Sequence, residues 1–101
     1  MLAHHVYFSL HDSTPEKVQR LTEECRQYLA DHPGTVFFAV GGVAEQYARP
    51  VNDRDFDVAL HVVFASEADH DAYQVAPLHQ EFIARNKATW SKVRVFDSLV
   101  E

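Results

Sequence analysis

A tyrosine and a histidine on either side of a proline are the side chains of this sequence best suited to proton transfer. Tyr73 precedes Pro77, and His79 follows it. Proline is well tolerated in the first turn of a helix, where the N–H that it lacks would have no partner. Pro77 therefore predicts a helix with His79 in its first turn. A helix N-terminus disfavours a charged imidazolium, which suits His79 to act as a general base beside Tyr73.

The same two residues also have a structural interpretation. His79 could hydrogen-bond a carbonyl of the first strand or of a loop, and Tyr73 could bury its ring and pair its hydroxyl with His79. A further set of mostly apolar residues could wall a small ligand pocket beside this pair, or could be ordinary core. This ligand-pocket set is His4, Val6, Phe8, Val58, Leu60, Phe82 and Trp90.

The seven histidines show no spacing typical of a metal site. There is no His-x₃-His pair and no Cys/His cluster, and the adjacent His70 and Asp71 cannot face one site along a helix. His4 with His79 offers two nitrogens at most, so we expect no metal. Gly41-Gly42 lacks the following helix start of a phosphate-binding loop, so no nucleotide, flavin or other cofactor is expected.

Apolar periodicity predicts the elements that position these residues. Either Thr14 or Ser13 caps a first helix, which ends by Gly34, and Ser66 caps a second. The predicted strands cover residues 3–10, 35–43, 56–65 and 92–100, and the last helical segment runs from Pro77 to about Trp90.

Three details accompany this assignment. Gly41-Gly42 suggests a bulge or a bend in the second strand. Alternation places Phe56 on the same face of the third strand as Val58. Residues 46–54 are predicted to form an exposed loop. Its charged residues and their neighbour could line the rim of a pocket or could simply be solvated; they are Arg49, Asp53, Arg54 and Asp55.

The order of elements is β-α-β-β-α-β with the second helix split in two, which predicts a ferredoxin-like α+β unit over residues 1–101 as one domain. Both helices cover one face of an antiparallel sheet. The other face carries Tyr7, Ala59 and Val63 and is too apolar to remain in water, so we expect a homodimer through that face. A monomer with one wet face is the alternative. His5 and His61 should point to the dimer side.

Composition excludes several classes of function. The net charge is −6 with histidines neutral, and the basic residues are scattered, so we expect no nucleic-acid partner. No apolar run is long enough for a membrane span, and the N-terminus lacks the pattern of a secretory signal, so a cytoplasmic protein with no membrane partner is expected. The single cysteine, Cys25, is expected in the core.

Four segments together carry a family resemblance. They are His4–Asp12, Phe56–Leu60, the Tyr73…Pro77-Leu-His79…Phe82 stretch, and Trp90–Asp97. In order and spacing they resemble the stress-responsive A/B barrel (Dabb) family over nearly the whole chain. The resemblance implies a ferredoxin-like homodimer whose two sheets meet as an α/β barrel.

The resemblance also bears on activity. The family contains boiling-stable plant stress proteins, many bacterial proteins without an assigned role, and a plant polyketide cyclase in which a histidine and a tyrosine act as an acid/base pair. The matching positions here are His79 and Tyr73, and His4 and Trp90 match residues of its pocket. Val58 and Ala76 replace two of its histidines.

Two classes of function follow. The favoured one is a small structural or stress-associated dimer without chemistry, with a pocket between sheet and helices that could hold a small apolar or aromatic molecule. The alternative is an enzyme with His79 as general base and Tyr73 as its partner. It would be polyketide-cyclase-like or, since related dimeric barrels include them, a cofactor-free monooxygenase. Whether the protein is an enzyme stays open at this point.

Overall fold

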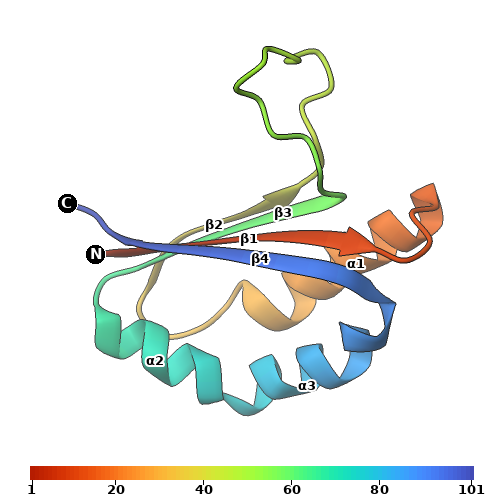
Figure 1. Ribbon diagram of the computed structural model, residues 1–101. Coiled ribbons are helices and arrows are strands. Elements are labelled where there is room, and N and C mark those ends of the chain that lie inside the picture. The colour runs from red at the N-terminus through yellow and green to blue at the C-terminus, as the bar shows by residue number, and fades with distance from the viewer.

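The computed structural model describes all 101 residues, whose strands and helices follow the predicted order (Figure 1). One short 3₁₀ helix, η1 (Lys87–Thr89), precedes the last strand. The strands are β1 (Leu2–Leu10), β2 (Thr35–Gly41), β3 (Val58–Phe64) and β4 (Trp90–Leu99). The helices are α1 (Pro15–Leu29), α2 (Glu67–Val75) and α3 (Pro77–Asn86).

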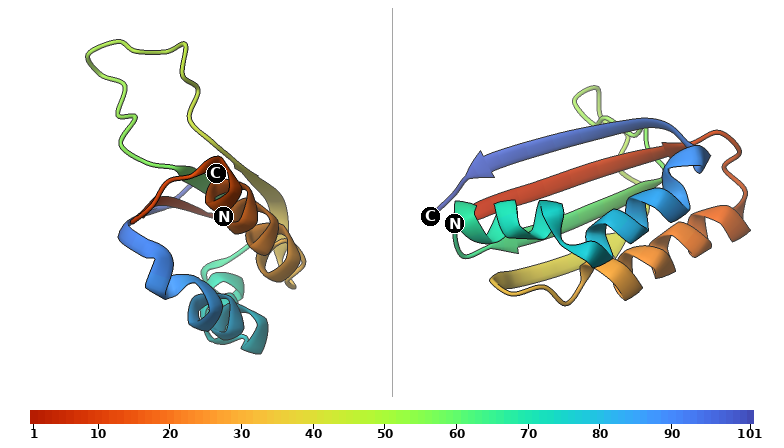
Figure 2. Two further views of the ribbon diagram at one scale, coloured as in Figure 1. Left: turned by 90° about the vertical axis from the view of Figure 1, so that its right-hand side faces the viewer. Right: turned by 90° about the horizontal axis from the view of Figure 1, so that it is seen from below.

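The four strands form one antiparallel sheet in the order β2-β3-β1-β4. All three helices lie on one face of this sheet, and the opposite face is bare of helices (Figures 1 and 2). This arrangement is the ferredoxin-like α+β fold, and the prediction from the element order is confirmed. None of the helices combines the length and the apolar character needed to cross a membrane.

Local capping signals fix where the helices begin. The Thr14 side chain accepts a hydrogen bond from the Lys17 N–H, and Pro15 occupies the first turn of α1. The Ser66 hydroxyl accepts a bond from the Asp69 N–H in the same way. Each cap satisfies one of the N–H groups that a helix start leaves without a partner. Of the two candidate caps for α1, Thr14 is therefore the one used.

The core lies between the sheet and the helices. Alternate residues of β1 and β3 point to the helices and are buried against α1 and α3. Cys25 is fully buried there, as expected. Burial of each large apolar side chain contributes about 1.5–3 kcal/mol to stability. The buried core cluster is Leu2, Val6, Phe8, Leu10, Leu21, Cys25, Tyr28, Leu29, Val58, Leu60, Val62, Phe64, Tyr73 and Phe82.

A polar cluster joins α1 to α3. The buried Glu24 carboxylate accepts a 2.7 Å bond from the Arg85 guanidinium, which lowers the pKa of Glu24, and a further bond from the amide of the fully buried Asn86. The side-chain Oδ1 of Asn86 in turn accepts from the Arg20 guanidinium. Because α3 also carries His79, this cluster fixes the helix that presents the histidine.

Several predicted boundaries shift: β2 ends at Gly41, β3 begins at Val58 and β4 begins at Trp90. The last helix ends at Asn86 rather than near Trp90, because the Thr89 hydroxyl donates to the Asn86 carbonyl in a tightened final turn. Trp90 is instead the first residue of β4 and pairs with Leu10. Of the bulge or bend expected at Gly41-Gly42, no bulge forms, and the chain instead leaves the sheet after Gly41. The register shifts lie elsewhere, between Thr35 and Phe37 in β2 and between Ser9 and Leu10 in β1.

Phe56 was also placed on the wrong face. The Phe56 N–H donates to the Arg54 carbonyl in a turn, so the extended alternation does not reach back this far. The Phe56 ring packs against the Tyr7 ring at 5.0 Å between centroids, on the sheet face without helices. We call this surface the open face; its strand residues include His5, Tyr7, Ala59, His61, Arg94 and Phe96.

A long connection between β2 and β3 projects from the sheet on the side opposite the helices (Figures 1 and 2). We call residues 42–57 the arm. Two ion pairs tie its base to β4, one from Asp53 to Arg94 at 2.7 Å and one from Asp55 to Lys92 at 2.5 Å. The charged loop residues Asp53 and Asp55 therefore hold the arm, whose outer part is exposed.

Candidate functional site

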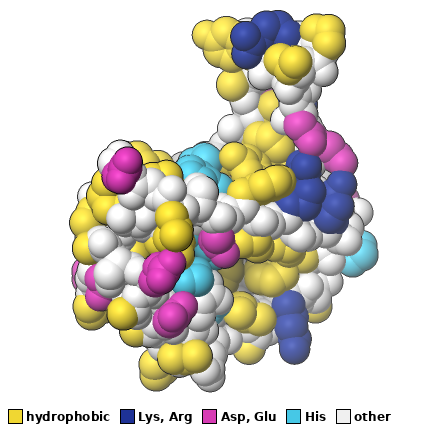
Figure 3. Space-filling model, turned by 60° about the vertical axis from the view of Figure 1, so that its left-hand side comes forward, with side chains coloured by type: hydrophobic (Ala, Val, Ile, Leu, Met, Phe, Trp, Pro, Cys, Tyr) yellow, Lys and Arg dark blue, Asp and Glu magenta, His cyan; other side chains and the backbone are white.

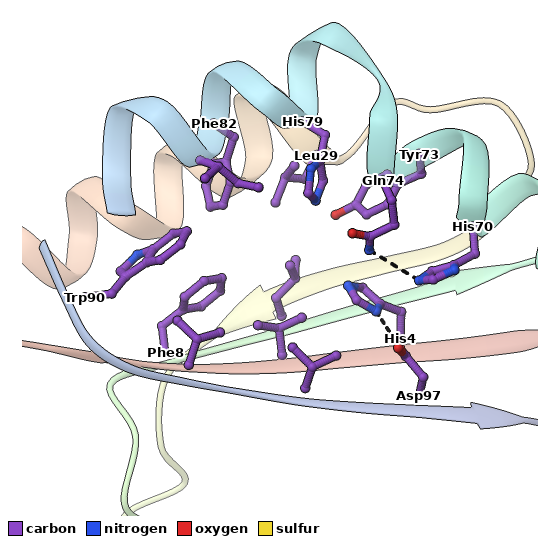
Figure 4. Close-up of a pocket in the computed structure, with 15 residues that line it drawn as sticks. His4, Phe8, Leu29, His70, Tyr73, Gln74, His79, Phe82, Trp90 and Asp97 are labelled. Carbon is purple, nitrogen blue, oxygen red and sulfur yellow. Dashed lines mark hydrogen bonds and ion pairs between the residues drawn. The ribbon is translucent and has the colours of Figure 1, made fainter. Parts of the chain in front are cut away.

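A cavity of about 410 Å³ lies between the sheet and the α2–α3 pair (Figure 4). Its walls come from β1, β3, β4 and all three helices. Of the predicted ligand-pocket residues, the structure places six around it: His4, Val6, Phe8, Leu60, Phe82 and Trp90. Val58 is the exception. It is fully buried in the core and does not line the cavity, because alternation specifies the face of a strand but not the depth at which a residue lies beneath the helices.

One end of the cavity is aromatic. The Phe8 ring lies 5.0 Å from the Trp90 ring and 6.1 Å from the Phe82 ring, as measured between centroids. Tilted contacts of this kind suit aromatic quadrupoles and leave flat apolar walls. Trp90 thus belongs to a strand rather than to the predicted helix, but its side chain still lies beside Phe8 and Phe82.

Tyr73 and His79 meet because of the break between the two helices. α2 ends at Val75, the Ala76 N–H donates back to the Tyr73 carbonyl, and Pro77 opens α3. The last turn of α2 and the first turn of α3 therefore face the cavity together, and the two rings lie edge to face at 4.6 Å between centroids. Figure 4 shows both side chains directed toward the same space.

The two side chains do not hydrogen-bond each other. The Tyr73 hydroxyl and the His79 Nδ1 are both buried, and neither has a hydrogen-bond partner in the protein. A buried polar group without a partner typically costs about 1–3 kcal/mol, so these two atoms lower the stability of the folded chain. The structural interpretation, in which His79 anchors its helix to a carbonyl through this atom, does not match this geometry.

Burial keeps both groups uncharged at neutral pH. It lowers the pKa of His79 to about 4, with a further contribution from the neighbouring His4, His32 and His70. It also raises the pKa of the Tyr73 hydroxyl. His79 is therefore a neutral imidazole that can accept a proton, and Tyr73 is a neutral hydroxyl that can donate a hydrogen bond.

The other end of the cavity is polar. The His4 Nδ1 lies 2.5 Å from the Asp97 Oδ1, across the register that pairs β1 with β4. Burial lowers the pKa of His4, although the carboxylate opposes this shift. His70 of α2 packs beside His4, with the ring centroids 5.1 Å apart. The cavity thus runs from an aromatic end, past Tyr73 and His79, to a cluster of histidines and a carboxylate.

Sequence reasoning missed Asp97 and His70 as site residues. A signal for Asp97 was present, because alternation put it on the same face of β4 as Val93 and Val95, where a carboxylate is unusual. His70 had no comparable signal. Its approach to His4 depends on how α2 crosses the sheet, and this is not a local property of the sequence.

A second hollow, of about 610 Å³, lies on the open face at the foot of the arm. Tyr7 and Phe96 line it, together with the His5–His61 pair, whose ring nitrogens touch. In Figure 3 apolar side chains gather below the arm, with acidic and basic side chains beside them. His5 and His61 thus occupy the face on which the sequence placed them, and the Asp53–Arg94 pair rims this hollow rather than the cavity between sheet and helices.

Comparison with known proteins gives the family. The model of the stress-responsive A/B barrel domain (Dabb) matches residues 2–100. The chain belongs to this family. The match covers almost the entire A/B barrel domain described above, including both helices that form the cavity. No curated protein matches the sequence.

Solved structures share the A/B barrel chain's fold at low identity. A dimeric ferredoxin-like protein of unknown function from Thermobifida fusca has 19% identity and a TM-score of 0.80, covering 98% of this chain and 90% of that one. A Dabb family protein from Mesorhizobium loti has 20% identity and a TM-score of 0.79, covering 99% and 96%. A hydroxynitrile lyase from Passiflora edulis has 17% identity and a TM-score of 0.78, covering 99% and 93%.

Proposed function

We propose that this A/B barrel protein is a homodimer that binds a small molecule in the cavity of each chain. The dimer is supported by the open face, where Tyr7, Phe37 and Phe96 form an apolar surface that a second copy would cover. Phe37 and Phe96 lie on the two edge strands, β2 and β4, and are 55% and 54% exposed in the single chain, so this apolar surface is open to a partner. The Thermobifida fusca protein of the same fold is described as dimeric.

The ligand we propose has an aromatic or branched apolar body and a carbonyl or hydroxyl head group. The observation that carries this proposal is the pair of buried, unpartnered polar atoms on Tyr73 and His79 at the middle of an otherwise apolar wall. A ligand carbonyl there would accept from the Tyr73 hydroxyl, and the body would lie between Phe8, Phe82 and Trp90. Pockets of this kind use apolar contact for affinity and a few polar groups for orientation.

Trp90 is the only tryptophan of the chain and lies in the cavity wall, so its fluorescence reports on this site. We expect aryl alkyl ketones to change the emission in a saturable titration. Tyr73→Phe should weaken ketone binding about tenfold, the value of roughly one lost hydrogen bond. Alkylbenzenes of the same shape, which lack the carbonyl, should bind both forms equally. The proposal is refuted if no ketone gives a saturable signal. It is also refuted if Tyr73→Phe lowers the affinity for ketones and for alkylbenzenes equally.

A second candidate function is proton abstraction next to the ligand carbonyl, with His79 as general base and Tyr73 stabilising the developing oxyanion. The observation in its favour is that His79 is neutral at pH 7 and has a nitrogen without a partner beside the Tyr73 hydroxyl. An imidazole with a pKa of about 4 is a weak base, so this chemistry requires the Tyr73 hydroxyl to stabilise the developing oxyanion and lower the barrier.

Exchange of α-hydrogens for deuterium tests this chemistry without knowledge of the natural substrate. In D₂O, the protein should accelerate α-exchange of a bound aryl ketone, followed by NMR, and His79→Gln should abolish the acceleration while ketone binding persists. Equal exchange with the variant, or no acceleration by the native protein, would leave the binding function alone standing. Oxygen uptake with the same ketones separates the cofactor-free monooxygenase alternative from simple proton transfer.

A further inference from the structure

The polar end of the cavity brings together three side chains with metal-binding atoms. His4 comes from β1, His70 from α2 and Asp97 from β4. Each offers one ligand atom, and these atoms all lie within 4.8 Å of one another. The sequence gives no spacing for such a site, because the three residues lie on separate elements and converge only through the β1–β4 register and the placement of α2.

The hydrogen bonds of His70 fix which of its nitrogens is available. Its Nδ1 lies 3.2 Å from the Asp71 carboxylate, to which it donates. Its Nε2 lies 3.3 Å from the Gln74 amide nitrogen, from which it accepts. The Nε2 lone pair at the cavity edge accepts this amide N–H (Figure 4), so a metal ion that binds Nε2 would displace the Gln74 amide. A carboxylate that holds the far N–H of an imidazole is the usual outer partner of a metal-binding histidine, because it orients the ring and raises its basicity.

The His4–Asp97 contact provides the remaining two ligands. At 2.5 Å the His4 Nδ1–H donates to the Asp97 Oδ1. A tetrahedral ion with bonds of about 2.0–2.1 Å would take the place of that proton, and it requires the two atoms to separate to about 3.3 Å. Asp97 can make this movement, because it lies on an edge strand, its side chain is 41% exposed, and His4 is the sole hydrogen-bond partner of its carboxylate.

We propose that His4, His70 and Asp97 bind a divalent transition metal ion, with Zn²⁺ as the best match. Two imidazoles and one carboxylate favour Zn²⁺ and its neighbours over Mg²⁺ or Ca²⁺, which select oxygen ligands. Three protein ligands leave a fourth position open, and that position faces the cavity. The inference concerns a site at the polar end and does not depend on the ligand proposed for Tyr73 and His79.

Zn²⁺ titration of the full-length protein, by calorimetry without added organic ligand, tests the site. We expect one ion per chain. The proton displaced from the His4 Nδ1 passes to the Nε2 of the same ring, so the binding heat should not change with the ionisation enthalpy of the buffer. His70→Ala should weaken binding at least a hundredfold, and Asp97→Asn at least tenfold. Asp97 is partly exposed on an edge strand, so Asp97→Asn should fold and keeps the test valid if His70→Ala impairs folding.

The matched control lies on the opposite face of the same sheet. His5 and His61 are also a close histidine pair, and His61→Ala removes it without touching the cavity. We expect His61→Ala to bind Zn²⁺ as the native protein does. With Co²⁺ as a spectroscopic probe, a visible d–d band should appear with the native protein and with His61→Ala but not with His70→Ala. Binding that survives His70→Ala, that vanishes with His61→Ala, or that is no tighter than millimolar would overturn the proposal.

Discussion

Replacing Phe96 with Asp should raise the dissociation constant of the proposed dimer at least a hundredfold and leave a folded monomer. In a twofold interface each substitution appears twice, so two unpaired carboxylates would have to be buried against apolar surface. A hundredfold change corresponds to about 2.7 kcal/mol. Phe96 is 54% exposed in the single chain, so the monomer itself should lose little stability. Sedimentation equilibrium at micromolar concentration measures the effect.

Leu78→Asp is the matched control for this experiment. Leu78 is also a large exposed apolar residue, 45% exposed, but it lies on α3 at the helix side of the molecule. We expect this variant to remain dimeric. A native protein that sediments only as a monomer would refute the dimer, and a dimer that persists in Phe96→Asp but dissociates in Leu78→Asp would move the interface to the helices.

Acidification should destabilise the folded protein through His79. The unfolded chain takes up a proton on this imidazole below a pKa of about 6.5, whereas the folded protein resists protonation until about pH 4. Across this window the unfolded state binds more protons, so stability falls as the pH falls. The contribution of this group amounts to about 3 kcal/mol at pH 4 relative to neutral pH.

The difference between the native protein and His79→Gln isolates this contribution. In urea unfolding at fixed protein concentration with a chelator present, the native protein should lose about 3 kcal/mol more than the variant between pH 7 and pH 4. Gln80→Ala, an exposed change on the same helix without an ionisable group, should follow the native pH profile. Parallel profiles for the native protein and His79→Gln would mean that burial does not hold this imidazole neutral.

The parts of the fold that local chemistry determines were predictable from the sequence. Thr14, Ser66 and Pro77 mark helix starts because a cap or a proline acts within one turn. The strand faces followed from alternation, which correctly separated His4 from His5 and Asp97 from Phe96. The position of Phe56 was wrong because the alternation rule assumes an extended chain, and a turn at Arg54 ends that extension.

The candidate site was predictable only in part. Tyr73 and His79 are close in sequence, and a single helix break brings them together, so their proximity has a local cause. The cluster of His4, His70 and Asp97 has no local cause. Its formation requires the β1–β4 register and the path of α2 over the sheet, both set by packing of the whole core. How deeply a strand residue lies beneath the helices is also set by packing of the whole core. For this reason the sequence predicts Val58 in the cavity wall, whereas it lies in the core.

The strand order β2-β3-β1-β4 has a consequence for how the chain can be divided. Each pair of neighbouring strands joins one strand that precedes the arm in sequence to one that follows it. Strands from the two halves of the chain therefore alternate across the sheet. Neither half contains two neighbouring strands, and neither can make a sheet alone. Asp57, at the end of the arm, donates its N–H to the Phe8 carbonyl, whereas the exposed outer part of the arm makes no hydrogen bond to a strand backbone. A protease that cuts after Arg54 would therefore leave a two-fragment complex with the native sheet, which makes the arm a natural breakpoint for fragment complementation.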